Sequence, residues 1–382
     1  MNLVFFAVFG VILIIYSFLN YYIGLRVWES LGIFVPFLNS RVYWSFFWLL
    51  VFAYIIGRVS KNFLPYAVSY SLTQVGSYWL AAMVYFTTAY LLIDIISFLG
   101  KKAGINLLDF KAGPGVGITV LVFVVGVILF GSWSARSPRI VEYDVTINKP
   151  GNKVNSLNVV MVSDIHLGTI IHNGRLVSMV NRINELNPDI ILLPGDVIDE
   201  NIQYFIEQNM AETFSRLNPP LGIYAVMGNH EYIGGHADEI AVHLAEAGVV
   251  VLRDEVVLVN DSFYIIGRED RDSQRFAGQS RKSIKELMAH VDPSLPLILL
   301  DHQPNNLSEH KKAGIDLQVS GHTHRGQLFP FHLITGRIFE IDWGHLQDGD
   351  YNIIVSSGYG TWGPPIRVGH RSEIVKINIQ FQ

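Results

Sequence analysis

The chain has 382 residues, of which 50% are hydrophobic and only 16% charged, and its formal net charge is −5. This length suits two or three domains, and an acidic balance without a basic stretch argues against a nucleic-acid partner. The chain contains no cysteine. Disulfides and thiolate metal sites are therefore excluded, and any metal must be held by His, Asp, Glu, Asn or main-chain oxygen.

Four apolar segments in the first third of the chain are candidate membrane spans, because a bilayer requires roughly 20 apolar residues per helix. We predict them at residues 3–22, 42–56, 78–99 and 116–133, within a transmembrane domain of residues 1–135. The basic residues that flank these segments divide almost evenly between the two sides, so they do not orient the chain. Asp94 is the only acid within a predicted span and lies close to one end, which favours an interfacial, structural role over a proton path.

The apolar pattern breaks at residues 134–138, and a soluble pattern follows. Residues 136–156 are interpreted as a linker and the first strand of the soluble domain, the strand itself at residues 140–147. Apolar residues at helical spacing predict helices near residues 176–186, 240–247 and 284–288. Strands alternating with helices indicate an α/β domain that is long enough to bury a real core.

Five short apolar runs each end in a loop that carries His, Asp or Asn. These runs are predicted to be buried strands at residues 159–162, 190–193, 223–226, 297–300 and 317–319. In open α/β sheets, functional loops gather outside the carboxyl ends of the strands. One such edge would collect the candidate metal ligands Asp164, His166, Asp196, Asn229, His302, His322 and His324. Seven oxygen and nitrogen ligands are too many for one small cation and suit two.

Each loop also has an ordinary explanation when it is taken alone. A Gly-Asp pair after a strand is usually a turn, an Asn-His pair in a loop is usually solvated, and a lone buried histidine is usually a satisfied core residue. These explanations would have to hold for five loops together, whereas one shared metal centre explains them all. Glycines beside three of the clusters, Gly195, Gly228 and Gly321, also fit close approach of the backbone to a shared centre.

The order of these motifs resembles the calcineurin-like metallophosphoesterases. The family pattern Asp-x-His, Gly-Asp, Gly-Asn-His-Glu, a His and Gly-His-x-His is matched by Asp164/His166, Gly195-Asp196, Gly228-Asn229-His230-Glu231, His302 and Gly321-His322-Thr323-His324. The match covers residues 157–382 and is similar to a bacterial membrane-linked branch. It implies an N-terminal all-α transmembrane bundle of about four helices and an α/β metallophosphoesterase domain, built as a two-sheet β-sandwich flanked by helices.

The resemblance also implies a dinuclear metal centre. One divalent ion would be held by Asp164, His166 and His324, the other by Asn229, His302 and His322, and Asp196 would bridge the two. Such a pair of ions clamps the oxygens of a phosphoryl group while a metal-bridging hydroxide attacks it. The ligand types admit Mn, Fe, Zn or Co.

Two further residues are catalytic candidates. His230 follows the ligand Asn229 directly, and we interpret it as the general acid that protonates the leaving group. Asp199 matches the family position that orients this histidine, although a turn-forming acid explains it equally well. Arg325 beside the last ligand, and Tyr359, Trp362 and Arg367 in a glycine-rich aromatic loop, are candidate substrate contacts. For these four residues, surface or packing roles are the alternative.

The predicted function is a membrane-anchored dinuclear phosphoesterase that hydrolyses phosphomonoesters or phosphodiesters. The spans suggest a membrane-proximal substrate, such as a lipid-linked or envelope phosphate ester. An alternative is a membrane sensor or scaffold whose domain binds without cleaving, but the complete ligand set with His230 argues against it. A transporter is disfavoured because the spans carry one internal charge. We expect a multi-pass protein of the cell membrane, and the absence of cysteine leans toward an extracytoplasmic catalytic domain.

Overall fold

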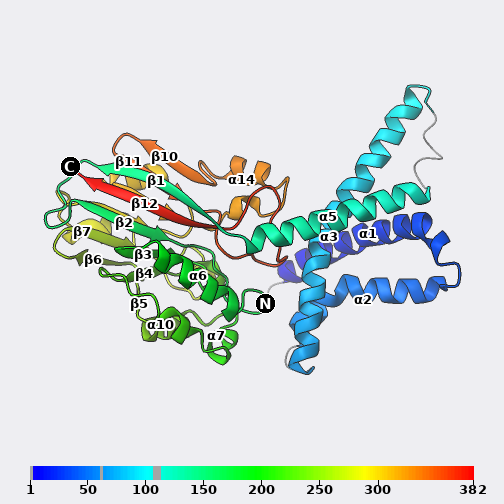
Figure 1. The fold of residues 1–382 in the computed structure, drawn as a ribbon, viewed down its shortest axis with the longest axis horizontal. Helices are drawn as coiled ribbons and strands as arrows, with labels where there is room; N and C mark the ends of the chain where they lie inside the picture. Colours follow the sequence, from blue (N-terminus) through cyan, green and yellow to red (C-terminus); the bar gives the residue numbers. More distant parts are fainter. Residues whose placement is uncertain (1–2, 61–62, 106–112) are drawn as a thin grey trace. The chain divides into compact units, whose positions relative to one another are not determined.

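The computed structural model describes residues 3–60, 63–105 and 113–382. The chain divides into two compact units, one formed by residues 1–133 with 363–366 and the other by residues 134–362 with 367–382. Figure 1 shows long helices in the first unit and a layered arrangement of strands and helices in the second.

The N-terminal unit is built from four long helices. They are α1 (Leu3–Leu31), α2 (Ser40–Val59), α3 (Tyr66–Lys102) and α5 (Pro114–Arg136), with a 3₁₀ turn η1 (Gly32–Phe34) after α1. All four are long and apolar enough to cross a membrane, which confirms the number of predicted spans. The helices α1 and α3 extend well beyond the predicted segments, because hydropathy marks the apolar part of a helix and not its continuation through interfacial residues.

Asp94 links two of these helices. The hydroxyl of Tyr22 on α1 donates a hydrogen bond to Oδ2 of Asp94 on α3 at 2.6 Å, and Nη2 of Arg26 lies 3.4 Å from its Oδ1. A charged side chain inside an apolar bundle is tolerated when it is paired in this way. These contacts agree with the structural role that the sequence favours for Asp94.

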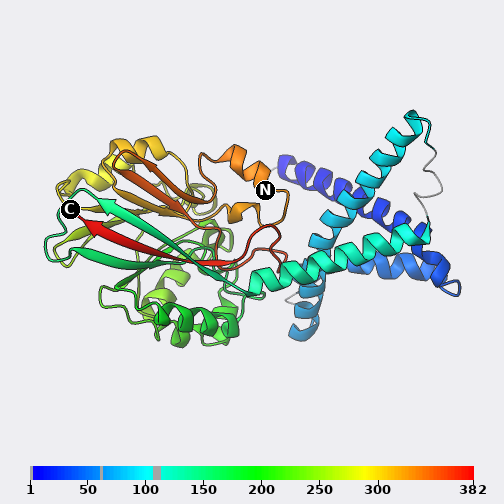
Figure 2. The ribbon, with the colours of Figure 1, turned by 45° about the horizontal axis from the view of Figure 1, so that its top comes forward.

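The second unit is a sandwich of two six-stranded sheets, which Figures 1 and 2 show from two angles. In order across the first sheet lie β1 (Arg139–Ile147), β12 (Glu373–Phe381), β2 (Ser156–Met161), β3 (Ile190–Pro194), β4 (Ile223–Val226) and β5 (Val249–Val251). Across the second lie β10 (Gly344–Asp348), β11 (Tyr351–Val355), β9 (Leu317–Ser320), β8 (Leu297–Leu300), β7 (Phe263–Gly267) and β6 (Glu255–Val259).

Parallel strands form the centre of both sheets. In the first sheet β2, β3, β4 and β5 run parallel, whereas β12 is antiparallel to β2 and parallel to β1. In the second sheet β7, β8, β9 and β11 run parallel and the edge strands β6 and β10 are antiparallel to their neighbours. The central strands are buried on both faces, which explains their continuous apolar runs.

The pleat divides these apolar runs between separate cores. On β2, Val159 and Met161 pack between the two sheets, whereas Val160 faces the helices that cover the first sheet. Those helices are α6 (Asn173–Glu185), α7 (Gln203–Glu207), α8 (Met210–Phe214) and α10 (Ala237–Glu246). The outer face of the second sheet is covered by α12 (Ile284–Leu287) and α13 (Leu307–Lys312). The two-sheet α/β sandwich flanked by helices is therefore confirmed.

The remaining elements are short. They are α9 (Asn229–Ile233), α11 (Ser273–Phe276), η3 (Met288–His290), η4 (His324–Gly326) and α14 (His332–Ile338). The predicted helix at residues 284–288 is only one turn of α-helix that tightens into η3. The strands β5, β6 and β10 were not predicted, because they lie at or next to the sheet edges, where few of their residues are buried.

Candidate metal centre

The seven predicted ligands follow five parallel strands, β2, β3, β4, β8 and β9, and converge at one end of the sandwich. Five of the seven have a left-handed backbone, with φ of 50° at Asp164, 52° at His166, 53° at Asp196, 72° at His322 and 47° at His324. Asp and His are among the few non-glycine residues that adopt this region readily. The chain therefore turns sharply after β2, β3 and β9. A main-chain bond between two of these loops runs from the amide of Asp164 to the carbonyl of Gly195 at 3.1 Å.

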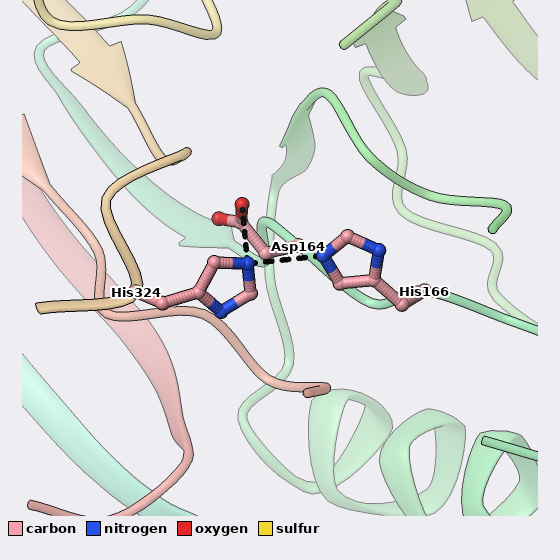
Figure 3. Close-up of side chains that lie close together, drawn as sticks. All are labelled: Asp164, His166 and His324. Carbon is pink, nitrogen blue, oxygen red and sulfur yellow. Dashed lines mark hydrogen bonds and ion pairs between the residues drawn. The ribbon is translucent and has the colours of Figure 1, made fainter. Parts of the chain in front are cut away.

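The first ligand group joins the two sheets. Figure 3 shows Asp164 and His166 from the loop after β2 facing His324 from the loop after β9. Nε2 of His166 lies 3.0 Å from Nε2 of His324, and Nε2 of His324 lies 3.4 Å from Oδ1 of Asp164. Ligands bound at about 2.0–2.2 Å from one ion stand roughly 3–3.5 Å apart, so these separations suit a shared cation.

The second ligand group centres on Asn229, the first residue of α9. Its Oδ1 lies 3.1 Å from Nε2 of His302 and 2.9 Å from Nδ1 of His322. Oδ2 of Asp196 lies 3.3 Å from Nε2 of His302 and 3.7 Å from Nε2 of His166. Asp196 thus stands between the two groups, within reach of one histidine of each.

The chemistry of the donor atoms fits divalent cations. Among the residues that the structure describes, no hydrogen-bond partner reaches the buried Oδ2 of Asp164. Burial, reinforced by the neighbouring Asp196 carboxylate, raises the pKa of Asp164 to about 6. Burial and the positive charge of neighbouring histidines lower the pKa of His166 to about 4 and that of His322 to about 3. Neutral imidazoles and an unpaired buried carboxylate oxygen are what a metal ion requires of its ligands.

Asp196 and His302 form a fully buried charge pair. Burial opposes ionisation of both, yet the Asp196 carboxylate holds the pKa of His302 well above its usual value, and His302 with His230 holds the pKa of Asp196 well below its own. The two side chains therefore stabilise each other's charged form.

Three glycines permit this packing of loops. A Cβ at Gly195 would overlap the ring of His302, one at Gly228 would overlap the carboxylate of Asp196, and one at Gly321 would overlap the carboxylate of Asp164. Each glycine belongs to one ligand loop and faces a ligand from another. The close backbone approach expected from the sequence is therefore present at all three positions.

Glu231 has a role that sequence reasoning missed. Its side chain is fully buried and accepts hydrogen bonds from the amides of Gly228 at 2.8 Å, Ile198 at 3.0 Å and Asp196 at 3.2 Å. Burial, together with the nearby Asp196 carboxylate, raises the pKa of Glu231 to about 7. The carboxylate ties the loop after β3 to the loop after β4. Its position in the Gly-Asn-His-Glu motif was the one sequence signal that could have indicated this role.

His230 and Asp199 lie beside the metal ligands. Nδ1 of His230 is 2.9 Å from Oδ1 of Asp199, and the amide of His230 donates to Oδ1 of Asp196 at 3.0 Å. Burial would lower the pKa of His230, but the carboxylates of Asp196 and Asp199 raise it to about 9. The geometry therefore supplies a protonated imidazole, held by an acid, at the wall of a cavity.

The four candidate substrate contacts differ in whether their side chains reach the cavity. Trp362 is 53% exposed, lines the cavity and lies with its ring centre 6.4 Å from that of His230. The guanidinium of Arg325 stacks over the ring of Trp343 at 4.1 Å and does not line the cavity. This contact favours a packing role for Arg325.

The side chains of Tyr359 and Arg367 are both buried, which favours the packing role that the sequence left open for them. The hydroxyl of Tyr359 donates to the carbonyl of Arg175 at 3.0 Å, which makes Tyr359 a core residue. Arg367 donates from Nη2 to the carbonyl of Gly360 at 2.6 Å, and the same nitrogen lies 3.3 Å from Nδ1 of His324. Arg367 therefore supports a metal ligand from behind. A glycine-rich loop does not reveal from its sequence which side chains turn inward.

Comparison with known proteins identifies the family of the chain. The profile of the calcineurin-like phosphoesterase family matches residues 157–326. A metallophosphoesterase from Aquifex aeolicus is 37% identical over 262 residues, covering 66% of this chain and 97% of that protein. A transmembrane protein with metallophosphoesterase domain from Danio rerio is 30% identical over 271 residues, covering 68% of this chain and 60% of that protein. A solved 5'-nucleotidase precursor from Thermus thermophilus aligns with a TM-score of 0.34 and 16% identity, over 59% of this chain and 54% of that one.

The chain belongs to the calcineurin-like metallophosphoesterases, which are hydrolases of phosphoric ester bonds. Its four apolar helices, and relatives described as transmembrane proteins, make it a membrane protein of that family. The family assignment made from the motifs is thereby confirmed.

Proposed function

We propose that this protein is a membrane-anchored dinuclear-metal phosphoesterase that hydrolyses phosphomonoesters or phosphodiesters. The observation that carries the proposal is the position of Asp196, whose Oδ2 lies between His166 of one ligand group and His302 of the other. Asp164 and His324 complete the first group, and Asn229 and His322 complete the second. When bound, two divalent ions supply Lewis-acid polarisation of the phosphoryl oxygens and lower the pKa of a water nucleophile.

The remaining steps belong to side chains of the chain itself. His230 faces the cavity with a proton that Asp196 and Asp199 stabilise, so it donates that proton to the departing ester oxygen. Asp199 holds Nδ1 of His230 and leaves its Nε2 for the substrate. Only Asp164 and Asp196 among the ligands are anionic, so two divalent ions would keep the site positive and attract a phosphate.

The spans suggest where the substrate lies. The last span α5 ends at Arg136 and β1 begins at Arg139, so two residues tether the catalytic domain to a membrane helix. A lipid-linked or envelope phosphate ester fits such a tether. We place the domain on the extracytoplasmic side, since a chain without cysteine is suited to an oxidising compartment. Because the chain has no native cysteine, a Val242→Cys variant labelled in intact cells by a membrane-impermeant maleimide tests this side; labelling only after lysis would refute it.

The hydrolytic proposal is tested with purified full-length protein and a chromogenic phosphodiester in the presence of Mn(II). We expect turnover in the wild type, and loss of both turnover and one bound metal in Asp196→Asn. Val242→Ser, on the exposed face of α10, is the matched control and should retain both. Full turnover by Asp196→Asn, or turnover that survives chelation in the wild type, would disprove the dinuclear mechanism.

A further inference from the structure

A cavity of about 650 Å³ opens beside the metal centre. One end of it is formed by the ligands Asp196, Asn229, His322 and His324, together with His230. Cavities of roughly 300–1,000 Å³ hold drug-sized ligands, so this one has room for much more than a phosphate group. The rest of the cavity wall therefore has room to contact the part of a substrate that lies beyond its phosphate group.

That remaining wall is apolar. Its large apolar side chains are Ile233, Phe331, Ile334, Phe339 and Trp362, which we call the apolar wall, and Glu200, Thr323, Gly326 and Thr335 line the cavity beside them. Trp362 lies next to His230, so the wall begins on the side where the leaving group departs. Four of its five residues follow residue 326, where the family profile ends. The wall is thus largely outside the part of the chain that carries the shared chemistry.

The apolar wall continues onto the surface along α14. Ile334 is 55% exposed, and Ile338, one turn further on the same helical face, is 68% exposed. Among its described side chains, α14 has none that is buried. Large apolar side chains gathered at a site and left exposed indicate a bound apolar group.

The residues that line the cavity disfavour substrates with a second anionic group. Among the described residues that line it there is no lysine or arginine, and the only charged side chain apart from the metal site is Glu200. A substrate with a second phosphate or a carboxylate would find no lysine or arginine among these lining residues to pair with it. A substrate with a hydrocarbon chain would bury it against the wall.

We propose that the apolar wall makes this protein selective for phosphate esters that carry a hydrocarbon chain, that is, amphiphilic lipid-type phosphoesters. The phosphate binds at the metal ligands and the chain lies across Ile233 and Ile334 toward Ile338. This inference rests on the proposed phosphoesterase function and adds the residues that select the substrate.

The test uses full-length protein with two substrate series, alkyl phosphate monoesters and symmetric dialkyl phosphodiesters, each with methyl, butyl and hexyl chains, so that an alkyl chain is always part of the leaving group. Burial of one methylene corresponds to about fourfold in kcat/KM, so five methylenes could give up to about a thousandfold. Because the wall is half open to solvent, we expect at least a tenfold rise from methyl to hexyl. Adenosine diphosphate, which carries a second phosphate, should be a poorer substrate than hexyl phosphate.

The double variant Ile233→Ser/Ile334→Ser should reduce the hexyl-to-methyl ratio to below threefold. Val242→Ser, which removes a similarly exposed apolar side chain from α10, should leave the ratio unchanged. Because the long-chain substrates partition into detergent equally with both variants, this control corrects for that effect. A flat chain-length response in the wild type, a ratio that survives the double variant, or a preference for adenosine diphosphate would overturn the inference while leaving the phosphoesterase function intact. Absence of metal-dependent turnover in both series would instead refute the proposed function itself.

Discussion

Replacement of His230 by alanine should separate substrates by their leaving groups. An alkoxide is a strong base and must be protonated as it departs, whereas p-nitrophenolate leaves readily without a proton. General acid catalysis contributes about 10²- to 10⁴-fold. We therefore expect His230→Ala to lose that factor in kcat on an alkyl phosphate and less than about tenfold on a p-nitrophenyl ester.

The contact with Asp199 sets the size of a second, smaller effect. A hydrogen bond to a charged group contributes about 1.5–3 kcal/mol, or roughly 10- to 150-fold. The side chain of Asp199 is 21% exposed, which weakens the bond, so Asp199→Asn should cost about tenfold on the alkyl substrate. It should also lower the pKa of His230, so that the loss of activity on raising the pH begins at a lower pH than in the wild type.

The assay is kcat for both substrates across pH, with bound metal measured for each variant. Metal content matters because Asp199 also lies 3.9 Å from Nδ1 of the ligand His166. Glu239→Gln is the control, since His236 and Glu239 form a similar but exposed pair at 3.1 Å on α10, and it should change nothing. An equal loss on both substrates with metal retained would show that His230 does not act as an acid.

Three further outcomes follow from the packing of the site. Gly228→Ala should abolish stoichiometric metal binding by pushing Asp196 aside, whereas Gly336→Ala, whose Cβ meets only open space and one atom at 3.9 Å, should bind metal normally; metal analysis decides. Glu231→Gln should destabilise the domain by about 1–3 kcal/mol in denaturant unfolding, because a buried amide cannot accept all three backbone hydrogen bonds; an unchanged midpoint would contradict this role. Despite burial, the Asp196 carboxylate raises the pKa of His302 well above its usual value, so we expect metal binding near pH 7 to release about one proton and to tighten as pH rises. Calorimetry in buffers of different ionisation enthalpy measures this release, and binding without it would contradict the expectation.

The ligands could be predicted from the sequence because each follows a short buried strand. A continuous apolar run specifies a strand covered on both faces, and parallel strands present their following loops at one edge. The predicted runs at residues 223–226 and 297–300 coincide with β4 and β8. Spacing within a motif then places Asp164 and His166 on one sharp turn, and that part of the site needed no coordinates.

The residues that support the site were harder to predict. Whether Arg367 points to substrate or to the back of His324 depends on how a glycine-rich loop folds over another loop, which no local pattern records. The sequence left two roles open for Tyr359 for the same reason, since an aromatic residue in a loop can face solvent or core. Glu231 was visible in its motif, but its three amide donors come from two separate loops, Gly228 on one and Asp196 and Ile198 on the other.

Chemistry and selectivity therefore have separate origins in this chain. Each predicted ion draws ligands from both sheets: Asp164 and His166 from the first meet His324 from the second, and Asn229 from the first meets His302 and His322 from the second. The predicted metal centre forms only where the two sheets pack against each other, so the residues of its motifs must fit this packing. The apolar wall depends mainly on α14, the residues beside it and Trp362, which lie outside both sheets. A sequence motif can thus reveal the reaction, whereas the substrate must be inferred from the surface that the fold places beside it.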